Sequence, residues 1–407
     1  MALAGAVVAQ PVNPLDAMSG NPAGLAWFTR PTLSLGYLAA YGDAEFRNAV
    51  NGSTNFRTNF GHSGELAFSY PIPGGRGSLG FSIVPEAANL ADWRYLDAPG
   101  GADGLTTFGL QTHRTEFVAI RTAAGIGYQL TDQLAIGASV GLVYERIEFR
   151  APYIFQSTPG LAGFKTLLDL DTDGWAWNGE VGLIYRVCDD LQLGLRYRTS
   201  TSLQSEGEAR GNAGAQLASL GMGGLRSDFR YDGTAEISLP DLFSVGFSWQ
   251  ALPRLRVLGQ VDYIPWSEHF DAMRIKLRNG NNADLNALVG SSAIDDSVPI
   301  GWQDRVVARA AVEYELDAHW TARLGYAWSR SPIPSSHVTP LNAAISSHTL
   351  STGIGYHNDR CSVDVGYQFD LPNEQKVGTS VYQAGEYSNS SVDLHSHWLG
   401  VNATVSF

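Results

Sequence analysis

From Pro31 to the C-terminus, apolar and polar residues alternate with a period of two. In residues 320–328, Trp320, Ala322, Leu324, Tyr326 and Trp328 alternate with Thr321, Arg323, Gly325 and Ala327. Alternation of this kind places the two sets on opposite faces of a β-strand. No apolar run approaches the roughly 18 to 20 residues that a membrane-spanning helix needs. The pattern therefore predicts an all-β protein with one apolar face on most strands.

Composition and strand ends indicate where those apolar faces lie. Hydrophobic residues make up 44% of the 407 residues and charged residues only 16%, against roughly 25% charged in soluble domains. Composition alone fits a large soluble β-protein equally well. However, aromatic residues such as Tyr185, Tyr197 and Tyr356 close the apolar sets, and the last strand ends on Phe407. Aromatic girdles border the apolar band of membrane β-barrels, so these features favour a transmembrane barrel.

Connections between the predicted strands alternate between short turns and long loops, which is the asymmetry of outer-membrane barrels. We expect fourteen antiparallel strands and both termini on the short-turn side. They cover residues 31–41, 63–72, 77–86, 113–129, 134–149, 175–187, 191–206, 233–250, 255–279, 303–315, 319–329, 346–357, 361–371 and 391–407. Residues 30–407 are thus expected to form the barrel.

Residues 1–29 have no strand pattern. They are rich in small residues, contain Pro11, Pro14 and Pro22, and are too apolar for a solvated tail. We therefore expect them to pack against the rest of the chain. The start lacks the basic residues of a signal peptide, so we expect part of this segment to be missing.

Several classes of function are disfavoured. A net charge of −13 argues against nucleic-acid binding, which needs basic patches. The two cysteines, Cys188 and Cys361, have no metal-binding context, and we expect neither a metal nor a cofactor. Catalytic residues are also not expected: Ser346 and His348 share a face, but positions two apart on a strand are separated by roughly 6.6 Å.

The chain resembles the FadL/TodX family of outer-membrane transporters for long-chain fatty acids and hydrophobic aromatic compounds. The likeness runs along the whole chain. It is carried by Gly5–Ala26 with Asn21, Pro22 and Ala23, by Arg30-Pro31-Thr32, by Trp266-Ser267, by Trp302 to Asp304, by Arg323–Trp328, by Ser331–Pro334, by Thr339-Pro340 and by Gly353–Tyr356. The resemblance implies a fourteen-stranded barrel blocked by an N-terminal hatch at residues 1–29. It also implies capture of substrate by extracellular loops and sideways release at a kinked third strand.

The third predicted strand contains Pro85, which has no backbone N–H and cannot complete a ladder. After it, the alternation is lost. One interpretation places Pro85 at the end of the strand. The other, which we prefer, predicts an opening to the bilayer at Val84, Pro85, Glu86 and Ala87, covered from inside by the hatch.

Two long loops carry the apolar residues expected to capture substrate, unless they pack only against one another: Phe155, Leu161, Phe164, Leu167, Leu220 and Met222. Inside the barrel, Arg196, Arg198 and Arg323 are candidates for binding a carboxylate head group. The default role of these arginines is a salt bridge with lumen carboxylates such as Glu180, Glu313 or Asp364.

We therefore expect a monomeric, non-enzymatic channel of the Gram-negative outer membrane. It would take up long-chain fatty acids, hydrocarbons or monoaromatics passively and release them by lateral diffusion. Its partners would be this hydrophobic cargo and the surrounding lipid and lipopolysaccharide, with detergent bound in a crystal. A water-filled general or substrate-specific porin is the alternative, and an outer-membrane lipid hydrolase is a more remote one.

Overall fold

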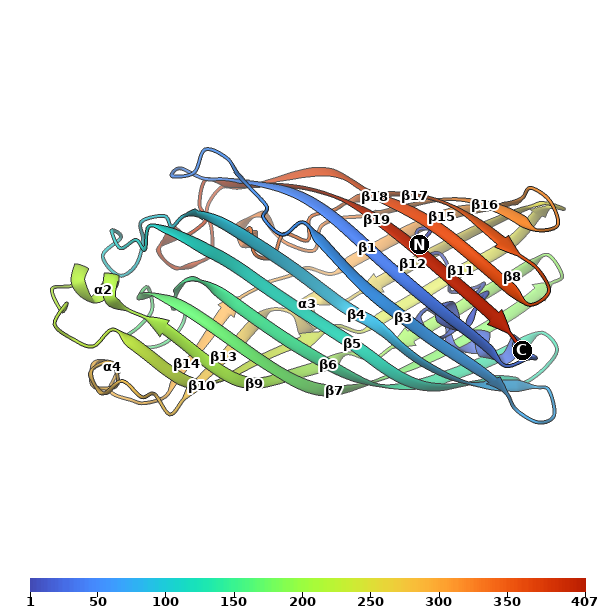
Figure 1. Ribbon diagram of the computed structural model, residues 1–407, viewed down its shortest axis with the longest axis horizontal. Coiled ribbons are helices and arrows are strands. Elements are labelled where there is room, and N and C mark those ends of the chain that lie inside the picture. Colours follow the sequence, from blue (N-terminus) through green and yellow to red (C-terminus); the bar gives the residue numbers. More distant parts are fainter.

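The computed structural model describes all residues, 1–407, and shows a closed antiparallel β-barrel of fourteen long strands (Figure 1). Four of these strands are interrupted, and each then carries two labels. The strands are β1 (Thr32–Arg47), β3 (Phe60–Pro71), β4 (Gly77–Leu96), β5 (Leu110–Gln129), β6 (Leu134–Ile154), β7 (Lys165–Cys188), β8 with β9 (Leu191–Arg198, Thr201–Asn212), β10 with β11 (Asp228–Leu239, Leu242–Leu252), β12 with β13 (Leu255–Ile264, Ala272–Arg278), β14 with β15 (Ile294–Pro299, Arg305–Glu315), β16 (Trp320–Ser329), β17 (His348–His357), β18 (Cys361–Val377) and β19 (Ser390–Ser406).

The barrel closes by pairing its first strand with its last. β1 and β19 are in register from Thr32 opposite Ser406 to Arg47 opposite Ser391. A short strand, β2 (Thr54–Asn55), adds to the upper end of β1. Closure pairs the edges that the first and last strands would otherwise leave free, and it confirms the predicted fold class.

Helices are few and short: α1 (Pro14–Gly20), α2 (Gly214–Ser219), α3 (Trp266–His269), α4 (Ala283–Val289) and the 3₁₀ turns η1 (Pro22–Trp27), η2 (Ser335–His337) and η3 (Gln383–Gly385). None of them has the length and apolar character required to cross a bilayer. α1 and η1 lie inside the barrel, whereas α2 and α4 lie among the long loops (Figure 1).

Several strands are longer than predicted at the end carrying the long loops. β7 begins at Lys165, ten positions before its predicted start, and its outward face changes from Trp175 and Trp177 to Asp169, Asp171 and Asp173. The outward acids bind arginines of β6, for example Arg146 to Asp171 at 2.9 Å. The strands therefore continue past the apolar band, with charged residues outside and apolar residues inside. The prediction ended them where the outward apolar set ended.

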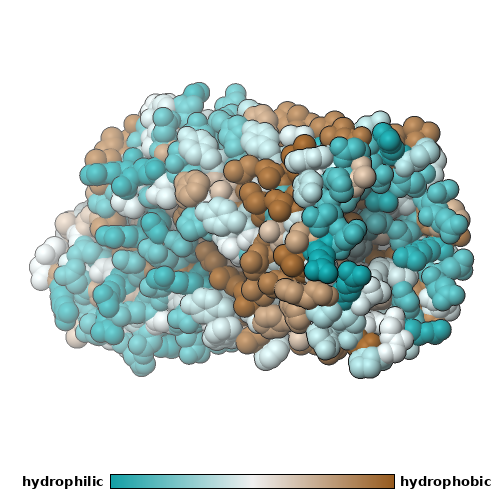
Figure 2. Space-filling model, turned by 45° about the vertical axis from the view of Figure 1, so that its right-hand side comes forward, coloured by the Kyte–Doolittle hydropathy of each residue, from teal (hydrophilic) through white to brown (hydrophobic).

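The outer surface has the character of a membrane protein. Leu193, Leu195, Val245 and Phe247 are among the exposed apolar side chains of the strands. In Figure 2 the hydrophobic residues gather towards the middle of the face shown, with hydrophilic residues on both sides. This distribution matches a barrel whose middle lies in lipid and whose long-loop end projects into water.

The interruptions in β8–β15 lie side by side. β12 and β13 are separated by a short segment that contains α3, and Trp266 packs against Trp302 of the neighbouring strand with ring centroids 4.6 Å apart. Backbone bonds from Ile300 N and Gly301 N to Asp271 O, both 2.8 Å, keep these strands joined. The Trp266-Ser267 motif therefore marks an irregular but hydrogen-bonded part of the wall.

Candidate transport path

The N-terminal segment, residues 1–29, fills the short-turn end of the bore. Its backbone is hydrogen-bonded to strands on different sides of the barrel. Val7 N and Val8 N both donate to Gln260 Oε1 at 3.0 Å, and Arg309 Nη1 donates to Ala4 O at 2.6 Å. Ser351 Oγ and Ser78 Oγ donate to Ala2 O and Phe28 O at 3.0 and 2.7 Å. A segment tied to β4, β12, β15 and β17 lies within the barrel (Figure 1).

Asn21 is the polar centre of this segment. Its side chain is fully buried, and Nδ2 donates to Val8 O at 2.7 Å and to Leu183 O and Leu195 O, each at 3.2 Å. Its Oδ1 accepts from Ala23 N at 3.1 Å, which caps η1. The Asn21 side chain thus links the start of the segment, at Val8, to η1 and to the strands β7 and β8. Pro22 and Ala23 follow as the first residues of η1 and are buried against the wall.

Glycines of the wall make room for the segment. A Cβ atom added at Gly137 would lie 2.2 Å from the Pro22 carbonyl carbon, and one added at Gly182 would lie 1.9 Å from Asn21 Oδ1. The same holds for Gly194 against Val8, Gly127 against Ala26 and Gly80 against Met18. The nearest atoms belong to the backbone of the segment at Gly137, Gly194 and Gly127, and to side chains at Gly182 and Gly80. Only glycine, which has no Cβ, permits contacts this close. The sequence analysis did not use these glycines, although they recur on inward positions of successive strands.

The barrel wall is interrupted between β3 and β4. The two strands pair only from Pro71 opposite Ser78 to Leu66 opposite Ile83. Beyond that point β3 pairs only with β1, while β4 continues to Leu96, paired only with β5. The separation ends where Arg57 N donates to Asp92 O at 2.8 Å. We call the unpaired stretch, residues 60–65 facing 84–91, the wall gap.

Pro85 lies at the lower edge of the wall gap, and it does not end its strand. β4 bulges there: Pro85 is opposite Ile120 but Ala87 is opposite Ala119, which leaves Glu86 as an extra residue. The bulge exchanges the two faces of the strand. Val84 is buried before it, whereas Ala87 faces inward and Ala88 is exposed after it. This exchange explains why the alternation is lost at this point of the sequence.

An apolar cluster inside the bore adjoins the wall gap. It consists of Ala119, Val143, Ala176, Leu203 and Leu239, with Ala87, Phe117 and Ile237 packed against it. We call it the wall cluster. Because Ala87 belongs to both the bulge and this cluster, an apolar surface leads from the interior to the gap.

The lumen arginines are bound to carboxylates. Arg196 Nε is 2.8 Å from Glu180 Oε1, and Arg198 Nη1 is 2.6 Å from Glu86 Oε1. Arg323 contacts both Glu313 at 2.7 Å and Asp364 at 2.5 Å. These contacts correspond to the default salt-bridge role. The partner of Arg198 is a residue of the bulge itself, which ties the lower edge of the wall gap to β8.

Arg121 and Arg309 are lumen arginines that the sequence pattern did not single out, and Arg121 differs from the others. Its side chain is buried, and it donates to Asn178 Oδ1 at 2.8 Å and Ser139 Oγ at 2.9 Å, with no carboxylate in ion-pair range. Arg186, near the end of β7, stacks on the Trp27 ring with its guanidinium carbon 3.7 Å from the ring centroid. That contact holds the last turn of the N-terminal segment.

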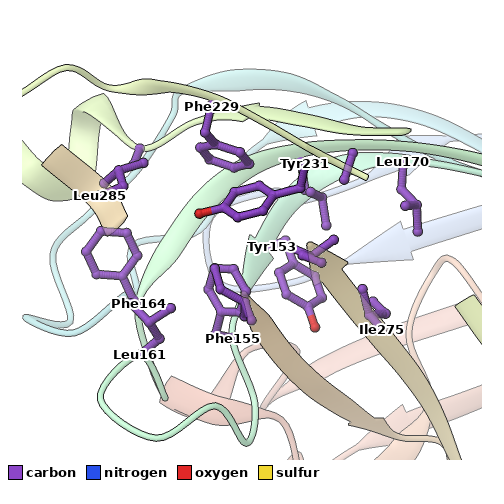
Figure 3. Packing of buried hydrophobic residues seen from close by; sticks show 14 of the residues in the cluster. Tyr153, Phe155, Leu161, Phe164, Leu170, Phe229, Tyr231, Ile275 and Leu285 are labelled. Carbon is purple, nitrogen blue, oxygen red and sulfur yellow. The ribbon is translucent and has the colours of Figure 1, made fainter. Parts of the chain in front are cut away.

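Apolar residues of the long loops form the largest buried cluster (Figure 3). Phe155, Leu161 and Phe164 pack with Phe229, Tyr231 and Leu285, which belong to β10 and α4. We call this group the loop cluster. Met222 packs at its edge, Leu167 is half-buried, and Leu220 is 40% exposed. The hollow within it measures about 20 Å³, room for roughly one water molecule.

Polar side chains hold the loops together over this cluster. Asp296 accepts from Gln156 N at 2.9 Å, Ser157 N at 2.6 Å and Tyr153 Oη at 2.5 Å. Lys165 Nζ lies 2.6 Å from Asp97 Oδ1, and both side chains are almost completely buried. Burial raises the pKa of Asp97, and the adjacent Lys165 opposes that shift.

A further loop, residues 330–347, folds into the upper bore and was not predicted to take part. Trp93 Nε1 donates to Pro340 O and Asn89 Nδ2 to Leu341 O, both at 2.9 Å. Ile333, Val338 and Ile345 of this loop are buried beside Phe46 and Trp93. The inner face of β4 is therefore covered by this loop from Asn89, in the upper part of the wall gap, to Trp93 above it. The largest hollow, about 940 Å³, lies on the outer surface across β5–β8, β11 and β12, away from this path.

The whole chain, residues 1–407, matches the family profile described as "Outer membrane protein transport protein (OMPP1/FadL/TodX)". A long-chain fatty acid transport protein of Escherichia coli O6:H1 is 22% identical, with 96% of this chain and 88% of that protein covered. The Ralstonia pickettii toluene transporter TbuX has a similar structure, with a TM-score of 0.75, 20% identity and coverage of 100% and 97%. A Pseudomonas aeruginosa FadL homologue has a TM-score of 0.76 at 16% identity, with coverage of 99% and 96%.

Proposed function

Since the chain belongs to the OMPP1/FadL/TodX family of outer-membrane transport proteins, and is thus an integral barrel of the Gram-negative outer membrane, we propose that it releases small hydrophobic cargo sideways through the wall gap. The cargo would be long-chain fatty acids, hydrocarbons or monoaromatics, taken up passively. The related proteins are transport channels rather than enzymes, and we infer the same for this chain.

The observation that carries the proposal is the loss of β3–β4 pairing while β4 continues. Backbone groups without partners at membrane depth are tolerated only where they line a cavity or are covered. An apolar molecule leaving at this point would pass from the wall cluster into lipid without crossing water. Each CH₂ group kept out of water is worth about 0.8 kcal/mol, so the sideways route is downhill.

We propose that the loop cluster captures the cargo. Phe155, Leu161 and Phe164 pack together so closely that binding requires the loops to separate. The same proposal makes residues 1–29 a hatch that blocks a straight route to the short-turn end. The hydrogen bonds of Asn21 to both β7 and β8 support that role.

Bridging the wall gap is expected to stop uptake. Cys188 and Cys361 are free and exposed, so both are first replaced by Ser. His62→Cys on β3 and Ala88→Cys on β4, two positions that both face outward, are then joined by a bifunctional maleimide that contains a cleavable disulfide. We expect uptake of a fluorescent fatty acid or of toluene by cells to fall about tenfold, a barrier increase of about 1.4 kcal/mol, and to recover after reduction.

The control places the same bridge where the strands are paired. Tyr70 and Leu79 are direct partners below the gap, and Tyr70→Cys with Leu79→Cys should leave uptake unchanged when bridged. Equal uptake with and without the bridge at 62 and 88 would refute release through the wall gap.

A further inference from the structure

Glu145 is a buried acid in the bore that has no partner. It lies on β6 and faces inward, its exposure is 0%, and neither carboxylate oxygen has a hydrogen-bond donor. Its neighbours across the strands are Ala119 on β5 and Gly174 on β7. Both are small, so the carboxyl group is not enclosed by large side chains on either side.

The other lumen acids near the wall gap are different. Glu180 and Glu86 are each bound by an arginine, Arg196 and Arg198. Arg121 faces inward two positions from Ala119 on β5, but its guanidinium is hydrogen-bonded to Asn178 and Ser139. Beyond Gly174, Ser205 on β9 is hydrogen-bonded to Thr172 at 2.9 Å. Of these groups only the Ser205 hydroxyl comes close enough to contact Glu145, and that hydroxyl is engaged with Thr172.

Glu145 also occupies a particular place on the path. Along β6, Val143 on one side of it belongs to the wall cluster, and Ile147 on the other side belongs to the loop cluster. A cargo passing from the loop cluster to the wall gap therefore passes this carboxyl group. A buried polar group without a partner is costly, and it is the kind of group that a bound ligand can satisfy.

We propose that Glu145 is a recognition site for the hydroxyl group of hydrophobic cargo such as alkylphenols or long-chain alcohols. This inference rests on the proposed function. The hydroxyl donates to a Glu145 oxygen, while the hydrocarbon part lies against Val143, Ala176 and Ile147. A site built around an unpaired acceptor selects donors over hydrocarbons of equal size. It also disfavours carboxylates, because they would bring a second acceptor and no donor.

The test compares ligands that differ only in the hydroxyl group. Binding of 4-ethylphenol and ethylbenzene to the purified, detergent-exchanged protein is measured by quenching of tryptophan fluorescence. We expect wild type to bind 4-ethylphenol about tenfold more tightly, from the usual strength of a hydrogen bond to a charged group. Glu145→Leu should remove this preference and leave the affinity for ethylbenzene equal or higher. Glu145→Gln, which keeps an acceptor, should retain part of the preference.

The matched control is Glu148→Gln on the same strand, an acid that faces outward beside Arg114. It should behave as wild type, and heat-modifiable gel mobility confirms that each variant is a folded barrel. The inference is overturned if wild type binds both ligands equally, or if Glu145→Leu keeps the preference. If wild type binds neither ligand, the inference fails together with the proposed transport of monoaromatic cargo.

Discussion

Deletion of Glu86 is expected to lower uptake of hydrophobic cargo by about tenfold or more, a barrier increase of at least about 1.4 kcal/mol. Glu86 is the extra residue of the β4 bulge, between Pro85 opposite Ile120 and Ala87 opposite Ala119. Without it, β4 pairs with β5 with no extra residue, so that Ala87 stays inward opposite Ala119 and Ala88 stays outward opposite Val118. The bend that the bulge imposes on β4 would be lost, and the upper half of β4 could approach β3. Uptake by cells of a radiolabelled fatty acid or of toluene measures the effect.

Substitutions of Glu86 separate the effect of the extra residue from the effect of its salt bridge. Glu86→Gln and Glu86→Ala remove the salt bridge to Arg198 but retain the extra residue. We expect them to reduce uptake by no more than about threefold, corresponding to about 0.7 kcal/mol. Pro85→Ala restores a backbone N–H donor, and its loss of uptake should be larger than that of the two substitutions and smaller than that of the deletion. Normal uptake by the deletion variant, shown to be folded by gel mobility, would contradict a role for the bulge.

Asn21→Leu is expected to convert a closed barrel into a leaky one. The change removes the four hydrogen bonds that this side chain makes at a fully buried site, with Val8 O, Leu183 O, Leu195 O and Ala23 N. Each such loss costs about 1–3 kcal/mol, and leucine is branched where Gly182 leaves no spare room. The N-terminal segment should therefore leave its place. The barrel itself should remain, since its wall does not include this residue.

Single-channel conductance in planar bilayers measures the change. We expect wild type to show little steady conductance and Asn21→Leu to show frequent or continuous opening. Asn13→Leu is a useful control, because this side chain caps α1 and bonds only within the segment. A large steady conductance of wild type would favour the water-filled porin, and an unchanged Asn21→Leu would refute the hatch.

The fold could be predicted from the sequence because one physical signal recurs in every strand. Outward apolar residues such as Leu193 and Leu195 alternate with inward small or polar residues. Turns such as 188–190 interrupt the pattern. The strand ends could not be predicted as well. In β7 the outward face changes from tryptophan to aspartate without a change of secondary structure. A strand predicted from its apolar face therefore begins ten residues too late.

The path was only partly predictable. Pro85 signals a local disturbance, because its missing N–H is a property of the residue itself. Glu145, Arg121 and residues 330–347 gave no such signal, since their importance depends on partners far away in the chain. The loop residues Phe155 and Phe164 were found as apolar, but their packing against Phe229 and Leu285 depends on how the loops meet.

Photolabelling tests the sideways route most directly. A diazirine-bearing hydrocarbon is added to outer-membrane vesicles that contain the protein, and labelled residues are identified by mass spectrometry after brief irradiation. We predict labels on the loop cluster, then on Ala87, Ala88 and the facing residues 60–65 of β3, with protection when positions 62 and 88 are bridged. Labels confined to the N-terminal segment and the short turns, with none at the wall gap, would contradict lateral release.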